Sequence, residues 1–187
     1  MNDVNEAWRR IDASLTEQDE YATENFPPGA TPDAIARLEA ELGIALPDDV
    51  RAGLAYRDGT DQATLVEGTW SLLSVAEIRH SWGWMKTSHD AGEFAKHDES
   101  VRNEAGVKRA WWAPRWIPIA TDHGGDYVVV DLDPDTGGHA GQLVRVFRDY
   151  EVRRVIAPSF AEWMATLASE LDGGKYVWNE GLEPRDE

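Results

Sequence analysis

Three aspartates alternate along one short segment of the sequence, DLDPDTGG, at positions 131, 133 and 135. Carboxylates at alternate positions open the loop of a calcium-binding hand, which also requires glycine at its sixth position and glutamate at its twelfth. Thr136 and Gln142 occupy those positions here. A strand end followed by a tight turn explains the same residues, because aspartate side chains accept hydrogen bonds from nearby backbone N–H groups. We therefore expect a turn, with no metal and no cofactor.

A second candidate for chemistry is the segment DHGGD, in which His123 lies between Asp122 and Asp126 and could act as a general base. The sequence contains no G-x-S-x-G nucleophile motif, no zinc-type histidine spacing and no glycine-rich nucleotide motif. Gly124 and Gly125 fit a turn between two strands at least as well, since glycine allows a positive φ. We therefore expect no enzymatic activity.

The tryptophans are the third feature, because Trp82 and Trp84 are two residues apart and Trp111, Trp112 and Trp116 cluster. Neighbouring residues of an extended segment face opposite ways, so one of Trp111 and Trp112 is expected to leave the core. Two interpretations remain open. Either these side chains pack beneath a polar loop, or they anchor a protein partner, since tryptophan is enriched at interface hot spots.

The charge of the chain restricts its partners. The sequence holds 35 acidic and 18 basic residues, a net charge of −17. Such a chain repels nucleic acid and anionic membranes, because binding phosphate requires lysine and arginine. The charge would attract a basic protein, although a soluble acidic surface without a specific partner explains it equally well.

The compartment is expected to be the cytoplasm. The sequence contains no cysteine, which excludes disulfides and thiolate metal sites. It has no apolar run near the ~20 residues needed to cross a bilayer, and its first residues lack the apolar stretch of a secretory signal. We therefore expect neither a membrane nor a nucleic acid as a partner.

The elements that must position these residues are helices first and strands afterwards. Apolar periodicity predicts helices over residues 4–15, 32–42, 48–56, 74–82 and 159–171. Thr31 is expected to cap the second, Gly43 to end it, and Ser159 to form a capping box with Glu162. Strands are expected at 63–68 and 70–73 as an antiparallel pair, and at 116–122, 127–133, 142–149 and 152–157. Pro118 lacks an N–H group, which indicates an edge strand or a strand start.

The order of these segments resembles the SMI1/KNR4 (SUKH) superfamily. The resemblance rests on the combination of IARLEAELGIALPDDVR, YRDG, WIPIATDHGGD, DLDP, GQ and SF, and extends from about Trp8 to Leu171. It places the following residues on family motif positions: Gly43, Leu46, Pro47, Tyr56, Gly59, Trp116, Pro118, Gly125, Asp126, Asp131, Gly141, Ser159 and Phe160.

The resemblance implies an α+β fold with a mainly antiparallel, twisted sheet flanked by N-terminal helices and a C-terminal helix. We expect a single domain over residues 1–187, with a core from about residue 8 to 171 and a charged tail at 172–187. The resemblance also implies a binding role without catalysis.

Bacterial members of the family resemble immunity proteins, whereas fungal members regulate cell-wall synthesis. The resemblance therefore implies an immunity protein that neutralises a basic toxin, such as a nuclease, by occluding its active site. The alternative is a cytosolic regulatory scaffold linked to cell-wall synthesis. Residues 82–112 match the family pattern least and are the expected partner-specific surface. The expected partner-binding residues are Trp84, Asp90, Glu93, Asp98, Glu99, Trp112, Asp122 and His123.

Overall fold

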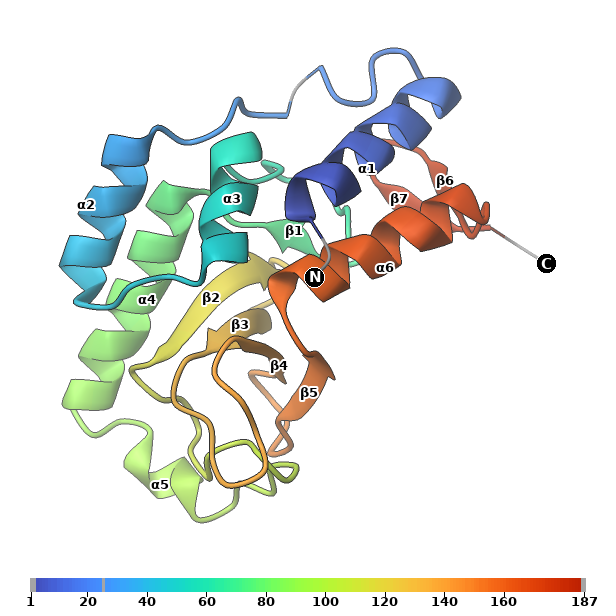
Figure 1. Ribbon diagram of the computed structural model, residues 1–187. Coiled ribbons are helices and arrows are strands. Elements are labelled where there is room, and N and C mark those ends of the chain that lie inside the picture. The colour runs from blue at the N-terminus through green and yellow to red at the C-terminus, as the bar shows by residue number, and fades with distance from the viewer. Residues whose placement is uncertain (1–2, 25, 186–187) are drawn as a thin grey trace.

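A computed structural model describes residues 3–24 and 26–185 of the chain. Helices surround a five-stranded antiparallel sheet, with a small two-stranded sheet beside it (Figure 1). The expected α+β fold is confirmed. The helices are α1 (Val4–Gln18), α2 (Pro32–Leu42), α3 (Asp48–Tyr56), α4 (Val75–Asp90), α5 (Ala95–Asp98) and α6 (Phe160–Asp172). The strands are β1 (Ser71–Leu72), β2 (Trp116–Thr121), β3 (Tyr127–Asp131), β4 (Gln142–Val146), β5 (Arg154–Ala157), β6 (Tyr176–Trp178) and β7 (Leu182–Pro184).

The large sheet is a meander in the order β1-β2-β3-β4-β5, with every neighbouring pair antiparallel. Successive side chains of a strand point to opposite faces, so each strand contributes to two cores. Ile117, Val128 and Leu143 face the first core, whereas Val129 and Val144 face the second. The sheet is therefore buried on both faces over most of its length.

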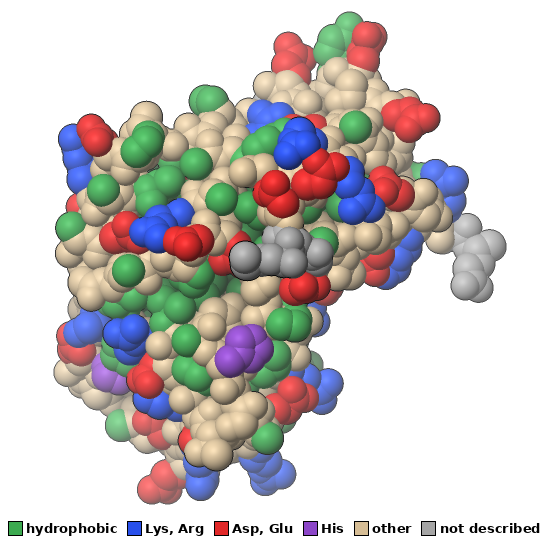
Figure 2. All heavy atoms as spheres, viewed as in Figure 1, with side chains coloured by type: hydrophobic (Ala, Val, Ile, Leu, Met, Phe, Trp, Pro, Cys, Tyr) green, Lys and Arg blue, Asp and Glu red, His purple; other side chains and the backbone are tan. Residues whose placement is uncertain are grey.

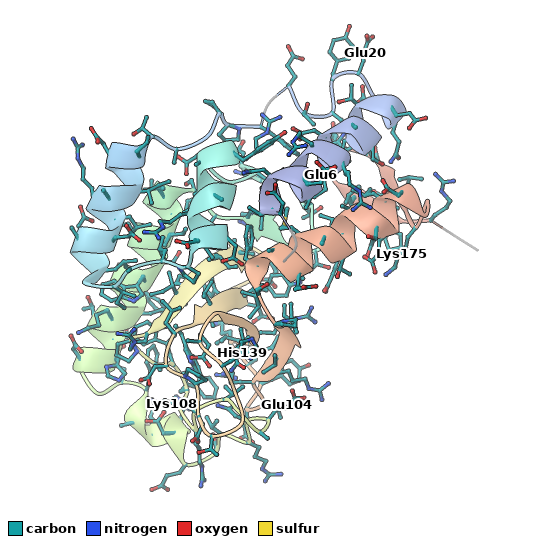
Figure 3. All side chains as sticks on the ribbon, in the orientation of Figure 1. Glu6, Glu20, Glu104, Lys108, His139 and Lys175 are labelled. Atoms are coloured by element: carbon teal, nitrogen blue, oxygen red, sulfur yellow. The ribbon has the colours of Figure 1, made fainter. Side chains whose placement is uncertain are left out.

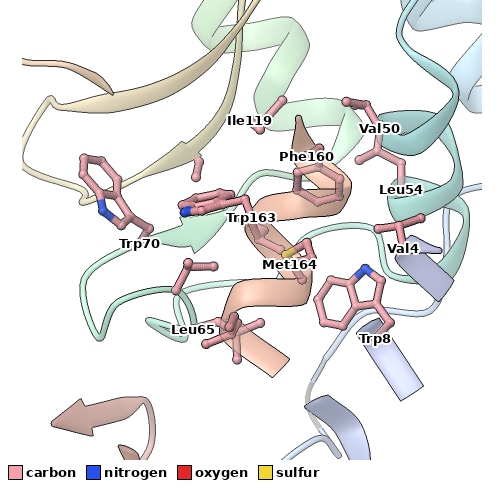
Figure 4. Close-up of a cluster of buried hydrophobic side chains, with 14 of the residues drawn as sticks. Val4, Trp8, Val50, Leu54, Leu65, Trp70, Ile119, Phe160, Trp163 and Met164 are labelled. Atoms are coloured by element: carbon pink, nitrogen blue, oxygen red, sulfur yellow. The ribbon is translucent and has the colours of Figure 1, made fainter. Parts of the chain in front are cut away.

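The first core is the larger and packs α1, α3 and α6 against the sheet. Trp163 and Met164 of α6 are buried near Trp8 of α1 and Trp70, as Figure 4 shows. The apolar stripe of α6 accounts for this position, because a residue at every third or fourth position faces the same side of a helix. The expected burial of Trp163 is confirmed.

The second core is smaller and packs the other face of the sheet against α4 and the segment that precedes β2. Met85, Val107, Trp112 and Trp116 are buried in it. This core covers only part of the face, and Tyr127, at the start of β3, remains partly exposed. The uncovered part of the face forms the groove described below.

Several element boundaries differ from those expected. The pair at 63–68 and 70–73 is reduced to one bridge between Val66 and Trp70, and only Ser71 and Leu72 form a strand. The helix expected to end at 82 continues to Asp90, because Met85 packs in the second core against the sheet. The strands expected at 127–133, 142–149 and 152–157 are shorter, at 127–131, 142–146 and 154–157.

Pro118 lies on an inner strand rather than on an edge. Strand β2 has β1 on one side and β3 on the other. However, β1 pairs only with Ala120 and Thr121, so Pro118 lies beyond that pairing and next to an irregularity in the register with β3. The missing N–H group of proline is therefore accommodated without a lost ladder bond to β1.

The packed core extends beyond the expected limits of residues 8 and 171. Val4 is buried at one end of the chain, and Tyr176 and Leu182 are buried at the other. The segment expected as a charged tail forms the β6–β7 hairpin, and the N–H of Trp178 donates to the Gln18 side chain at 2.9 Å. None of the helices in the described ranges has both the length and the apolar character needed to cross a membrane.

Candidate functional site

A surface groove lies along the uncovered part of the second sheet face. Its apolar half has a volume of about 450 Å³ and its polar half about 410 Å³. The two halves share His80 and Ser81 of α4, Gly125 and Tyr127, and Arg148, so they form one continuous depression. The volumes are those of ordinary ligand-binding clefts, which span roughly 300–1,000 Å³.

Aromatic side chains from distant parts of the chain line the apolar half. Trp84 projects from α4 and is 60% exposed. Phe94, Trp111 and Phe147 contribute further rings, and Trp112 lies beneath them. Neighbouring Trp82 is fixed by a hydrogen bond from its indole Nε1 to Pro114 O at 2.9 Å, so Trp84 is the member of this pair that is free to contact a partner.

The polar half is built on the turn between β2 and β3. Asp122 Oδ1 accepts hydrogen bonds from the N–H groups of Gly124 at 2.8 Å and Asp126 at 2.9 Å. These bonds hold the turn as an Asx-type structure and place His123 at φ 59°, with its side chain exposed. DHGGD therefore forms the expected turn, and His123 lines the groove. Within the described residues, no hydrogen bond or ion pair joins its ring to Asp122 or Asp126.

The adjacent tryptophans divide between surface and core as expected, but not in the expected order. Trp112, predicted as an exposed anchor, is only 2% exposed and belongs to the second core. Trp111 is the partly exposed member, and its ring lies 4.6 Å from the ring of His97. The alternation of side chains fixes that the two face opposite ways, but only the packing of the sheet decides which one is buried.

A buried arginine supports the groove, although no sequence pattern predicted its burial. Arg153 is fully buried, and its guanidinium lies 4.5 Å from the centre of the Trp111 ring. The guanidinium donates to the carbonyl oxygen of Trp111 from Nε at 3.3 Å and Nη2 at 3.0 Å, and also donates to Tyr150 O. Burial lowers the pKa of Arg153 to about 10. Arg153 directly precedes β5 and is the first of two consecutive arginines. Such a pair normally indicates a solvated surface.

The three alternating aspartates bind different protein groups. Asp131 is fully buried, and its carboxylate accepts from Gln142 Nε2 at 2.9 Å and from the N–H of Asp133 at 3.0 Å. Asp133 pairs with Lys108, in the loop near α5 (Figure 3), and Asp135 accepts from the N–H of Thr136. These contacts use the carboxylates as turn and packing groups.

Burial raises the pKa of Asp131 above its usual value, although the hydrogen bonds from Asp133 N–H and Gln142 favour the charged form. Trp116, Asp131 and Gln142 are cross-strand neighbours where β2 and β4 begin and β3 ends, so this buried polar group lies at one end of these three strands. Gln142, at the twelfth position of the calcium-like pattern, is thus a structural donor.

Four of the five acids expected to contact a partner lie in residues 82–112, and they differ in their surroundings. Asp90 pairs with Lys86, whose hydrogen bond lowers the pKa of the Asp90 carboxyl. Asp98 accepts from the N–H of Trp111 at 2.7 Å and is partly buried, so it positions the groove wall. Glu93 and Glu99 are exposed. On the face shown in Figure 2, acidic and basic side chains are interspersed rather than separated into patches.

The motif residues have structural roles. Gly43 ends α2 at φ 65°, and the ring of Tyr56 stacks on Trp8 at 5.7 Å. A Cβ at Gly59 would lie 2.7 Å from Ser74 N, so only glycine fits there. Apart from Pro118, described above, the other structural motif residues cap helices, fill the cores or shape turns: Leu46, Pro47, Trp116, Asp131, Gly141, Ser159 and Phe160. Gly125 and Asp126 differ, because both contact Arg148 in the groove.

A family model for the SMI1 / KNR4 family (SUKH-1) matches residues 29–166. The chain belongs to this family. The match includes the helices α2 to α5, the whole five-stranded sheet and about half of α6. It therefore contains both walls of the groove.

Fungal regulators are among the relatives of this SMI1/KNR4 protein. It is 32% identical to "Cell wall biosynthesis/cell cycle regulator smi1" of Schizosaccharomyces pombe, covering 95% of this chain and 38% of that protein. It is 28% identical to a "Glucan synthesis regulatory protein" of Neurospora crassa, over 95% of this chain and 40% of that protein. It is 22% identical to "Cell wall assembly regulator SMI1" of Saccharomyces cerevisiae, over 91% of this chain and 41% of that protein. The chain thus spans about two fifths of the length of these relatives. Their names agree with the expected alternative better than with an immunity protein.

Proposed function

We propose that this SMI1/KNR4 domain is a cytoplasmic regulatory module that binds a protein partner through the groove beside Trp84 and performs no catalysis itself. The single observation that carries the proposal is the accessible aromatic lining of the apolar half of the groove, which has a volume of about 450 Å³. Tryptophan side chains that are left accessible in a concave, mainly apolar site are typical of protein-binding hot spots. The names of the fungal relatives as regulators support the same conclusion.

The link to cell-wall synthesis is the finer part of this proposal. It rests on relatives of which this chain spans only about two fifths. The rest of those proteins could carry part of their regulatory activity. The shared domain would then supply the binding step, with the partner decided by the groove.

The immunity-protein function remains a second proposal, supported by the net charge of −17. A nuclease toxin needs basic surface to hold phosphate, and an acidic inhibitor can occupy that surface. Glu93 and Glu99 are the exposed acids best placed to contribute, because Asp90 and Asp98 already have partners within the chain. A toxin gene beside this gene would favour this proposal, and envelope-synthesis genes would favour the first.

Affinity capture from the native cell tests the proposal. The full chain, a Trp84→Ala variant and a Tyr21→Ala variant serve as baits, and bound proteins are quantified by mass spectrometry. Tyr21 is a matched control, because it is 63% exposed and lies outside the groove. We expect a protein that is enriched by the wild type and by Tyr21→Ala, and lost with Trp84→Ala. Equal capture by all three baits would refute the role of the groove.

A further inference from the structure

The polar half of the groove contains three cationic or potentially cationic side chains without a partner. In the described part of the chain, the imidazoles of His80 and His123 and the guanidinium of Arg148 make no hydrogen bond or ion pair with protein atoms. All three are exposed and line the same depression of about 410 Å³. Arg57, Lys108 and Arg145, by contrast, each form an ion pair with a carboxylate, in a chain whose net charge is −17.

The carboxylates around these donors accept hydrogen bonds from nearby groups of the chain. Glu77 accepts from the N–H and hydroxyl of Ser74 at 2.8 and 2.7 Å, which closes the capping box of α4. Asp122 accepts from two N–H groups of its own turn. Asp126 accepts from the backbone N–H of Arg148 at 2.8 Å. The neighbouring acids therefore hold the backbone in place and leave the side chain of Arg148 free.

Two motif residues position Arg148 in the groove. The hydrogen bond to Asp126 fixes its backbone. Gly125, at φ 110°, lets its side chain cross the β2–β3 turn, because a Cβ at this position would lie 2.9 Å from Arg148 Cδ. The side chain consequently lines both halves of the groove, where it adjoins the aromatic rings as well as the histidines.

We propose that the groove binds an acidic, hydrophobic peptide segment of the partner protein, with a bulky apolar side chain against Trp84 and Phe147 and an Asp or Glu carboxylate on Arg148. This inference rests on the proposed function and specifies the chemistry of its partner. The planar guanidinium binds a carboxylate through two parallel hydrogen bonds, and the apolar half supplies the desolvated anchor. A single carboxylate suits the site better than a phosphate, because the net charge of −17 and the three nearby acids oppose a dianion more strongly.

A peptide array tests the proposal. Short peptides carry one Trp and one Asp separated by a variable run of Gly and Ser, and matched series replace the Asp with Asn, Lys or phosphoserine. Fluorescence anisotropy then measures the best binder against the full chain and its variants. We expect the Asp peptide to bind roughly tenfold or more tightly than its Asn counterpart, as for a charge-assisted hydrogen bond.

Three variants separate the two halves of the groove. Arg148→Gln should reduce the affinity for the Asp peptide to that for the Asn peptide and leave the latter unchanged. Trp84→Ala should weaken both. Arg154→Gln, which alters an exposed arginine of β5 outside the groove, should affect neither. Thermal unfolding confirms that each variant is folded.

Every other outcome contradicts the inference. Equal binding of Asp and Asn peptides would show that Arg148 does not read charge, preference for Lys would indicate a basic partner, and preference for phosphoserine would indicate a phosphopeptide. No peptide binding tighter than roughly 1 mM would reject the groove as a peptide site. If capture from cells still depends on Trp84 in any of these cases, the protein-binding function stands with a partner of other chemistry. Loss of that dependence refutes both proposals.

Discussion

The guanidinium of Arg153 lies 4.5 Å from the centre of the Trp111 ring and donates two hydrogen bonds to the carbonyl oxygen of the same residue. A buried cation is costly unless its donors are satisfied. Arg153 forms no ion pair within the described residues, although the charge of Asp126 favours its cationic form. Carbonyl oxygens and an aromatic face supply its direct contacts. Arg153 therefore holds the backbone and the ring that form one wall of the groove.

The first prediction is that Arg153→Lys destabilises the protein by about 1–3 kcal/mol, because an ammonium group cannot reach the carbonyls of both Trp111 and Tyr150 and leaves one unsatisfied. Urea unfolding measures the change. Arg154→Lys is the matched control, because the neighbouring side chain is 65% exposed and should give a change within about 0.5 kcal/mol. Equal changes in both variants would show that the burial of Arg153 contributes nothing specific.

The second prediction concerns the main core. Trp163 is buried on the sheet-facing stripe of α6, so Trp163→Ala should cost about 3–5 kcal/mol of unfolding free energy. Trp84→Ala removes the same side chain from an exposed site and should change the free energy by less than about 0.5 kcal/mol. Denaturant unfolding of both variants checks the contrast, and a loss below about 1 kcal/mol for Trp163→Ala would mean that α6 is misplaced.

The third prediction concerns the buried pair Asp131 and Gln142. Replacing Gln142 with methionine removes the donor to the Asp131 carboxylate and to Gly106 O, and should cost about 1–3 kcal/mol near pH 7. Burial already raises the pKa of Asp131, and loss of the donor should raise it further. Below the unfolded pKa of 3.8, the Asp131 carboxyl is protonated in both the folded and the unfolded protein. The extra cost of a charged Asp131 without its Gln142 donor is therefore absent at low pH, and it appears as pH rises through the folded pKa.

The destabilisation by Gln142→Met should therefore be larger near pH 7 than near pH 4. Urea unfolding across this range, at low protein concentration because the pI is about 4.6, measures the difference. Gln62→Met, at an exposed loop position, should show no such pH dependence. A destabilisation of Gln142→Met that is constant with pH would mean that the donor does not act on the charge of Asp131.

The sequence predicted the elements that local signals define. Thr31 caps α2 and Gly43 ends it in the left-handed conformation, and both roles follow from residues within one helical turn. The end of α4 was missed because Gly83 and Trp84 interrupt its apolar pattern, whereas Met85 is held by the second core. Tertiary packing, which local propensity does not contain, decided that boundary.

The candidate site was predicted only in part. Trp84 and His123 were identified, and both line the groove. Trp112 was wrong as an exposed anchor, because which of two adjacent side chains is buried depends on the sheet they pack against. Arg148 and Arg153 were missed, because their positions depend on residues distant in the chain. Gly125 leaves room for the side chain of Arg148 in the groove, and Arg153 is buried in contact with Trp111.

The last prediction tests whether Gly125 positions Arg148. Gly125→Ala introduces two costs, a strained backbone at φ 110° and a Cβ 2.9 Å from Arg148 Cδ. Gly137→Ala is a matched control, because Gly137 has φ 92° but a Cβ there would meet nothing within 4 Å. Both variants should lose more than about 1 kcal/mol of stability through backbone strain.

Only Gly125→Ala should alter the groove, because only its Cβ displaces the Arg148 side chain. We expect its affinity for the acidic probe peptide to fall toward that for the Asn peptide, whereas Gly137→Ala keeps the wild-type ratio. Comparing the ratio of the two affinities, rather than either affinity alone, removes any general effect of lower stability. If both variants change the ratio equally, strain rather than the position of Arg148 controls binding. If neither changes it, Arg148 reaches the carboxylate without help from Gly125, and the close approach at the turn serves packing alone.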